Sequence, residues 1–217
     1  PLVYNSGIHL RTDACTNNGQ AEVGFIGRVL LNAFNAWEYG WECDREDLKA
    51  NSAKIFDSYL KNGFTEAGFF KESVNCDKNF EDPVHSIRRQ SEGLYAIFHF
   101  LAYEKEKGRK HLEWEQRLKN MLNMFLQLQN ADGSFPRKFR DDFSIVDKSG
   151  GSTPSATLPL VMGYKYFKDK RYLDSAKRTA DYLEKELISK ADYFSSTLDA
   201  NCEDKEASLY AATATYY

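Results

Sequence analysis

The feature that most constrains this chain is a regular alternation between two kinds of helical segment. Segments of the first kind carry almost no charge and fall at residues 21–36, 93–103, 154–167 and 207–217. Segments of the second kind, at residues 45–61, 110–129 and 170–188, place apolar side chains at steps of three and four with charged side chains between them. A helix without charges must be covered on most sides, whereas an amphipathic helix covers one face and leaves the other in water. The alternation therefore predicts an all-α fold of inner and outer helices.

Equivalent residues recur at a nearly constant interval. Tyr39, Tyr103 and Tyr166, near the ends of successive charge-poor helices, follow one another at intervals of 64 and 63 residues. A helical hairpin that returns at such a period is a repeat architecture, in which each unit buries its apolar helix against its neighbours. Three and a half hairpins fit into the 217 residues, and we expect a single domain over residues 1–217.

The connections between helices differ in length according to the end at which they lie. Short breaks near residues 106–108 and 168–169 follow the charge-poor helices, and longer segments at about 62–83, 130–153 and 190–202 follow the charged ones. Long loops gathered at one end are typical of a binding site built on a rigid scaffold. A ring of inner helices with a loop-rich mouth is therefore favoured over an open solenoid.

Three features resemble the (α/α) barrel or toroid proteins of the six-hairpin glycosidase superfamily and its relatives. They are the hairpin period, the segment LQNADGSF at residues 128–135, and the passages from loop to inner helix. The pattern Gln129-x-x-x-Gly133-x-Phe135 is also similar to part of the terpenoid-cyclase repeat, with Phe in place of Trp, but the aspartate-rich signatures of those enzymes are missing. A terpenoid-cyclase-like scaffold without that chemistry is thus one alternative. The resemblance implies an (α/α) toroid, of which this chain supplies only part.

Composition excludes several classes of partner. With 29 basic and 32 acidic side chains the formal charge is −3, so no basic field indicates a nucleic-acid partner. No apolar run approaches the roughly 18 residues of a membrane span. The four cysteines form no C-x-x-C pair, and we expect neither a metal site nor a cofactor. Oligomeric state and compartment stay open; analogy with carbohydrate-active relatives suggests a secreted or periplasmic location.

Candidate site residues lie just before, or in the first turn of, the inner helices, whose dipoles converge at the mouth. Asp13 is either a catalytic carboxylate or a helix cap. Asp199, Glu203 and Asp204 belong to a group of four carboxylates within eight positions, which is more than capping requires. Neutralisation of that group by Lys205 is the alternative reading.

A second candidate segment spans residues 81–92. A helix that begins near residue 83 would align His85, Arg88 or Arg89, and Glu92 as a polar stripe facing a lumen. In the alternative, Asp82 caps the helix and Arg89 pairs with Glu92 or with a loop carboxylate.

A third candidate segment precedes the helix at residue 154. Arg137, Lys138 and Arg140 place three cations within four positions, either to bind an acidic sugar or as a solvated loop. Thr153 followed by Pro154 indicates a helix cap with Pro at the first helical position.

Some histidines and aromatic residues have simpler interpretations. His99 lies among apolar residues and is expected to be a satisfied core histidine, whereas His111 is expected to be exposed. Phe69, Phe70 and Phe135 either stack on sugar rings or pack in the core.

The resemblance to the six-hairpin glycosidases implies a glycoside hydrolase acting on an oligo- or polysaccharide, with acidic sugars among the expected substrates. The reaction needs two carboxyl groups separated by about 5 to 9.5 Å, and the candidates are Asp13, Asp199, Glu203 and Asp204. The substrate-binding candidates are His85, Arg88, Arg89, Glu92, Arg137 and Arg140. Two alternatives stay open: a polysaccharide lyase on uronic acids, with His85 or a tyrosine as base and an arginine balancing the substrate carboxylate, and a non-catalytic module that binds glycan or protein.

Overall fold

The computed structural model describes residues 26–75, 80–149, 152–190 and 205–217, together with three short strands nearer the N-terminus. Those strands are β1 (Ile8–His9), β2 (Ala14–Cys15) and β3 (Gln20–Ala21). Four predicted catalytic residues, Asp13, Asp199, Glu203 and Asp204, lie outside the described residues. Their roles therefore stay predictions.

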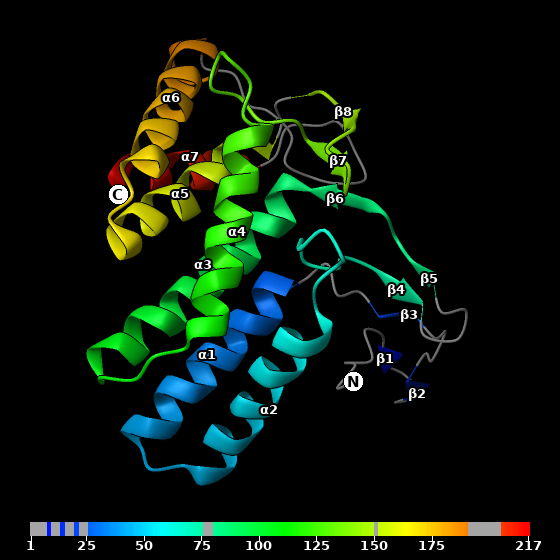
Figure 1. Cartoon of the computed structure of the whole chain (residues 1–217), viewed down its shortest axis with the longest axis vertical. Coiled ribbons are helices and arrows are strands. Elements are labelled where there is room, and N and C mark those ends of the chain that lie inside the picture. Colours follow the sequence, from blue (N-terminus) through cyan, green and yellow to red (C-terminus); the bar gives the residue numbers. More distant parts are fainter. Residues whose placement is uncertain are drawn as a thin grey trace.

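The described helices alternate between inner and outer positions, as the sequence predicts (Figure 1). The inner helices are α1 (Ile26–Glu42), α3 (Ile87–Glu106), α5 (Thr153–Phe167) and α7 (Lys205–Tyr216). The outer helices are α2 (Glu46–Asn62), α4 (Leu112–Leu128) and α6 (Lys170–Glu186), the last followed by a 3-10 turn, η3 (Ile188–Lys190). Along the inner layer α1 packs against α3, α3 against α5, and α5 against α7. The predicted all-α class is confirmed.

Burial follows the difference in charge between the two kinds of helix. In α3 the side chains of Leu94, Ile97 and Phe98 are at most 1% exposed, and buried residues occur around nearly the whole helix. In α6, by contrast, Tyr172 and Leu183 are buried on one face while the charged residues between them are exposed. The apolar side chains of both layers form one continuous core. None of the described helices is both long and apolar enough to cross a membrane.

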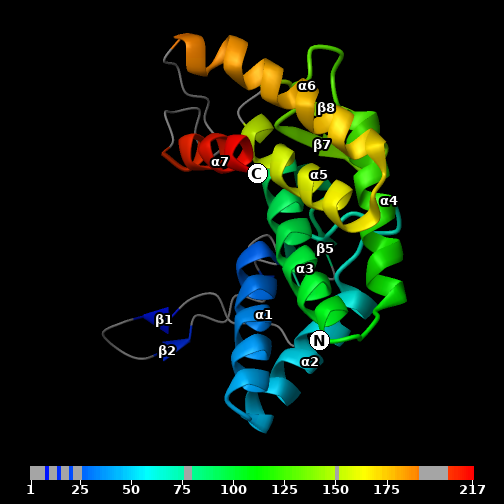
Figure 2. The same cartoon turned by 90° about the vertical axis from the view of Figure 1, so that its left-hand side faces the viewer.

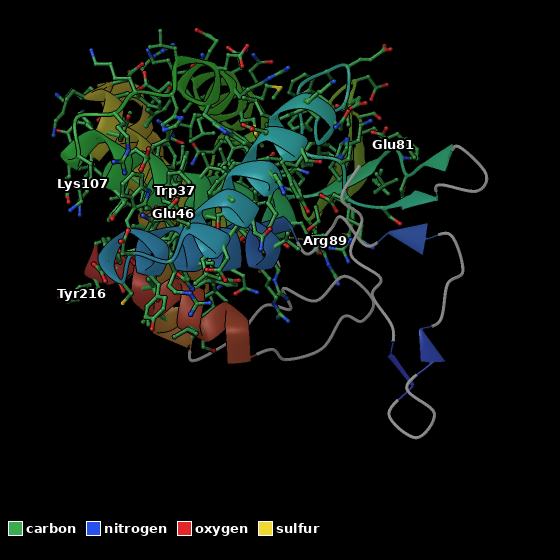
Figure 3. All side chains as sticks on the ribbon, turned by 90° about the horizontal axis from the view of Figure 1, so that it is seen from below. Trp37, Glu46, Glu81, Arg89, Lys107 and Tyr216 are labelled. Carbon is green, nitrogen blue, oxygen red and sulfur yellow. The ribbon has the colours of Figure 1, made fainter. Side chains whose placement is uncertain are left out.

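Short and long connections lie at opposite ends of the hairpins. Figure 3 shows Lys107, in the turn between α3 and α4, and Glu81, in a long connection, on opposite sides of the molecule. The long connections contain strands that periodicity does not reveal: β4 (Val74–Asn75), β5 (Phe80–Glu81), β6 (Val84–Ser86), β7 (Lys138–Arg140) and β8 (Ile145–Asp147). The antiparallel sheet β6-β7-β8 joins the connections that precede α3 and α5 (Figure 1). Figure 2 shows two of its strands, β7 and β8, from another side.

The motif Gln129-x-x-x-Gly133-x-Phe135 is a structural joint between the α4–α5 connection and α6. The Gln129 amide donates to the carbonyl oxygen of Ser175 at 3.0 Å and accepts from the Ser175 hydroxyl at 2.8 Å. Gly133 has φ +92°, and a Cβ atom there would lie 2.1 Å from the carbonyl oxygen of Arg178, so only glycine allows this approach. Phe135 is fully buried. The motif therefore stabilises the scaffold.

The candidate aromatic residues pack in the core. Phe69, Phe70 and Phe135 are each 0% exposed, so the packing interpretation is confirmed and these rings do not form a sugar-binding platform. Phe69 lies edge-on to Phe139 at a centroid distance of 5.0 Å, which fixes the strand β7 against the connection after α2.

Candidate functional site

A pocket of about 260 Å³ opens where the four inner helices converge. All of its described lining residues except Thr213 lie in the N-terminal halves of their helices. They are Arg28 and Leu31 of α1, Ser91, Glu92 and Tyr95 of α3, Ser155, Leu158 and Pro159 of α5, and Leu209, Tyr210 and Thr213 of α7. The pocket thus occupies the predicted position, at the loop-rich end of the inner layer.

A hollow of about 280 Å³ lies between α1 and α2, and two larger hollows of about 580 and 450 Å³ lie at α2 and α4. The two larger hollows share Asp57, Leu60 and Glu113, so they form one continuous groove between neighbouring outer helices. The inner pocket is lined by all four described inner helices, whereas the 450 Å³ hollow is lined mainly by α2 and α4, with one residue each from α1 and α3. Because enzyme sites are usually concave, with apolar walls and a few convergent polar groups, the inner pocket is the stronger candidate.

Glu92 is the centre of a polar cluster at this pocket. Its Oε1 atom accepts hydrogen bonds from Arg88 Nε at 2.9 Å and from the Tyr210 hydroxyl at 2.5 Å. The Arg88 guanidinium also lies 5.8 Å from the centre of the Tyr210 ring, within the range of a cation–π interaction. In the described part of the chain, the second carboxylate oxygen, Oε2, accepts no hydrogen bond.

The environment of Tyr210 makes its hydroxyl a donor. Burial raises the pKa of Tyr210 far above its ordinary value, the Glu92 carboxylate raises it further, and Arg88 opposes the change only weakly. A phenol of this kind stays protonated and does not serve as a base. Sequence reasoning did not single out Tyr210; the available signal was its place in the first half of the charge-free segment at residues 207–217.

Further polar groups occur at and below the pocket wall. Ser91 is 2% exposed, and its Oγ atom is buried without a hydrogen-bond partner. His99 packs against Phe34 and Tyr95, at centroid distances of 5.8 and 4.5 Å, and burial lowers its pKa. The predicted core packing of His99 is therefore found, but the prediction that it is satisfied is wrong, because its buried Nε2 atom has no partner.

His85 lies outside the predicted helical stripe. It belongs to strand β6, and α3 begins two residues later, at Ile87, because residues 84–86 pair with β7. Its ring is fully buried, with Nε2 at 2.8 Å from Asp141 Oδ1 and Phe139 beside it. His85 is not among the described residues that line the pocket.

The cap in front of α3 also differs from the expectation. Ser86, not Asp82, is the N-cap residue, and its side chain accepts from the backbone N–H of Arg89. Asp82 instead accepts from the backbone N–H of Val84 at 2.9 Å, before the strand.

Arg89 pairs with a loop carboxylate, which was one of the two expected alternatives. Its Nη1 atom lies 3.6 Å from Glu72 Oε2, while Glu72 Oε1 accepts from the backbone N–H of Ser86 at 2.7 Å and from Gln90 Nε2 at 2.9 Å. Burial raises the pKa of Glu72 to about 7, against the lowering effect of these donors and of Arg89. This cluster supports the start of α3 from the side of the connection.

The cations of the third segment are distributed along β7. Arg137 is 4% exposed and lies 3.7 Å from Asp147, whereas Arg140 is exposed and lies 3.5 Å from the Ser144 hydroxyl. Neither is among the described lining residues of the pocket. Among the predicted substrate-binding residues, Glu92 belongs to the described lining of the pocket, and Arg88 is hydrogen-bonded to it.

Two local expectations need correction. α5 begins at Thr153 with Ser152 as the N-cap residue, and the Thr153 hydroxyl bonds instead to the backbone of Phe135. His111 is only 32% exposed at its side chain, because its Nε2 atom lies 2.8 Å from the buried carboxylate of Glu104. Among the described residues, no group of three or more His, Cys, Asp or Glu side chains is arranged to hold a metal ion.

No protein-family profile matches the sequence. The fold is similar to a possible member of the GH105 family from Salmonella enterica serovar Paratyphi A, with 12% identity, a TM-score of 0.75 and coverage of 100% of this chain and 62% of that one. It is also similar to unsaturated glucuronyl hydrolase from Bacillus sp. GL1, with 15% identity, a TM-score of 0.59 and coverage of 79% and 48%. Cellobiose 2-epimerase from Bacillus thermoamylovorans gives 18% identity, a TM-score of 0.59 and coverage of 73% and 40%.

These similarities define the class of fold. The chain shares the (α/α) toroid fold of these proteins, which is the fold that the resemblance in the sequence implied. It spans between 40% and 62% of the length of these three proteins.

Proposed function

We propose that this chain belongs to a carbohydrate-active enzyme, a glycoside hydrolase that binds an oligo- or polysaccharide in the pocket at the N-terminal ends of α1, α3, α5 and α7. The observation that carries the proposal is the pocket itself, which combines apolar walls with a hydrogen-bonded carboxylate, Glu92. Mixed walls of this kind suit a sugar, which has both apolar and hydroxyl-bearing faces. The names of the structurally similar proteins, which include a glucuronyl hydrolase and a sugar epimerase, support the same substrate class.

The catalytic carboxyl groups are proposed from the sequence. Asp199, Glu203 and Asp204 come shortly before Lys205, the first residue of α7, and α7 contributes Leu209 and Tyr210 to the pocket. Together with Asp13 they are the candidates for the acid and the base of hydrolysis. Glu92, held by its hydrogen bond from Arg88, is proposed to bind the substrate, and Arg28 adds a positive charge at the pocket, which would suit an acidic sugar.

The state of Tyr210 favours hydrolysis over elimination on uronic acids. A lyase needs a group that removes a carbon-bound proton, and the sequence offered His85 or a tyrosine for this role. The raised pKa of Tyr210 opposes proton removal by its hydroxyl. His85 is fully buried and hydrogen-bonded to Asp141, away from the described pocket lining.

The test is to incubate the full-length protein with a panel of neutral and uronic-acid oligosaccharides. Hydrolysis releases new reducing ends without an unsaturated product, elimination releases them together with an absorbing unsaturated product, and epimerisation changes the sugar without cleavage. We expect new reducing ends without an unsaturated product, and we expect Asp199→Asn or Asp204→Asn to abolish them while circular dichroism shows an intact fold. Binding without turnover would instead identify a non-catalytic module, and unchanged turnover in every carboxylate variant would refute the proposed catalytic residues.

A further inference from the structure

The hydrogen bonds of Glu92 hold one of its oxygens and leave the other for a ligand. Arg88, one turn earlier in α3, and Tyr210, in α7, both donate to Oε1. Two donors from two helices fix the rotation of a carboxylate more firmly than one flexible partner, because turning it breaks both bonds. In the described part of the chain Oε2 accepts no hydrogen bond, although the side chain of Glu92 is only 15% exposed.

A second, independent observation points to a ligand at the same wall. Ser91 lines the pocket beside Glu92, is 2% exposed, and has a buried hydroxyl without a partner. Buried polar groups in folded proteins nearly always have a hydrogen-bond partner, and an exception usually has a functional explanation. A polar ligand in the pocket would satisfy Glu92 Oε2, and a rotation of the Ser91 side chain would let its hydroxyl bond to the same ligand.

The chemistry of the pocket defines that ligand further. A fixed carboxylate oxygen attracts hydroxyl donors and repels anions. Leu158, Pro159 and Leu209 give the same pocket an apolar wall. A sugar ring presents hydroxyl donors at its rim and carbon-bound hydrogens on its faces, so it complements both features.

We propose that Glu92 selects the bound sugar by accepting a hydrogen bond from one ring hydroxyl at Oε2, and that Arg88 and Tyr210 are positioning residues that orient Glu92 for this contact. The inference rests on the proposed function, because it takes a sugar as the ligand of the pocket. It identifies the group that recognises a hydroxyl of the substrate and the two residues that orient this group.

The inference predicts a coupling between one hydroxyl of the sugar and one residue of the protein. A hydrogen bond to a charged group is lost when either partner is removed, which corresponds to about 10- to 100-fold in affinity. Once Glu92 is changed, removal of the same hydroxyl has little further effect. A structural role of Glu92 would weaken all sugars alike.

The experiment measures binding of methyl glycosides to the full-length protein by NMR titration. The probes are the methyl glycosides of glucose, galactose, mannose and glucuronic acid, each compared with its monodeoxy analogues. For the wild-type protein we expect one monodeoxy analogue of the best-bound glycoside to bind about 10- to 100-fold more weakly than its parent. In Glu92→Gln that difference should largely disappear.

A matched pair of tyrosine variants tests the positioning role. Tyr210→Phe removes the donor to Glu92, and Tyr166→Phe removes an equivalent tyrosine–glutamate hydrogen bond, to Glu115 at 2.8 Å, outside the pocket. We expect Tyr210→Phe to weaken the parent glycoside more than the critical deoxy analogue. Tyr166→Phe should leave both affinities at the wild-type value.

Each outcome bears on the proposal. If Glu92→Gln weakens binding of the parent glycoside and of all its deoxy analogues by one common factor, or weakens binding of none of them, Glu92 does not recognise a hydroxyl and the inference fails. Oligosaccharide turnover in the same protein would leave the proposed function standing. If the protein neither binds these glycosides nor turns over any oligosaccharide, the proposed function fails and the inference falls with it.

Discussion

Glu72 should make the stability of the protein fall as the pH rises from mildly acidic to neutral. Its carboxyl group is 3% exposed, and burial raises its pKa from 4.5 to about 7. Between these two values the folded protein holds a proton that the unfolded chain releases. Folded protein is therefore favoured at the acidic end of this window, and the advantage is lost as the pH rises through it.

The size of the effect follows from the shift in pKa. Each pKa unit corresponds to about 1.4 kcal/mol, so the shift of Glu72 corresponds to roughly 3 kcal/mol across the window. In Glu72→Gln the side chain has no titrating proton, while its amide oxygen can still accept from the backbone N–H of Ser86. The variant should therefore lack this part of the pH dependence, and near pH 7 and above it should gain stability relative to the wild type.

The assay is urea unfolding at a series of pH values from about 4 to about 8, with the difference between wild type and variant as the measured quantity. Glu104→Gln is a matched contrast, because Glu104 is equally buried but its pKa is lowered by hydrogen bonds from Arg109, His111 and Trp37 that outweigh burial. Its contribution to stability is present above the unfolded pKa and is lost as the pH falls. If the wild-type and Glu72→Gln curves run parallel over the whole range, the reasoning about Glu72 is wrong.

Two further predictions concern glycines at close contacts. Gly133→Ala should lower the free energy of unfolding by at least about 2 kcal/mol, because φ is +92° and the new Cβ would overlap the backbone of Arg178; an unchanged urea midpoint would contradict this. Gly163→Ala brings a Cβ to 2.5 Å from Leu122 Cδ1, so we expect the free energy of unfolding to fall by about 1 to 3 kcal/mol. Shortening the neighbour with Leu122→Val should restore part of this loss. A double-mutant cycle measures the coupling between the two positions, and simple additivity of the two changes would refute the contact.

The helical scaffold could be predicted from the sequence because burial imposes a period on it. In α6, Tyr172, Ala176 and Leu183 fall on one face, and this face is the buried one. The charge-free segments were correctly assigned to the inner layer for the same reason, since a segment such as residues 93–103 of α3 has no charged side chain to present to water. The position of the pocket followed from the lengths of the connections.

The details of the site could not be predicted, because they depend on short strands and distant partners. Strand β6 has only three residues, too few to show a period, so His85 was assigned to the helix that starts just after it. Tyr210 and Glu92 are separated by 118 residues, and no local pattern links them. Glu72, in the connection after α2, could not be singled out from the sequence, because nothing but its residue type distinguishes it there.

The hydrogen bond between Tyr210 and Glu92 also has a consequence for the order in which the protein acquires its properties. During synthesis the N-terminal part of a chain emerges and folds first. A nascent chain that has reached only the end of α6 contains Glu92 and Arg88 but not the tyrosine that completes the arrangement. Ligand discrimination at this pocket would thus mature only after α7 has left the ribosome and docked against α5.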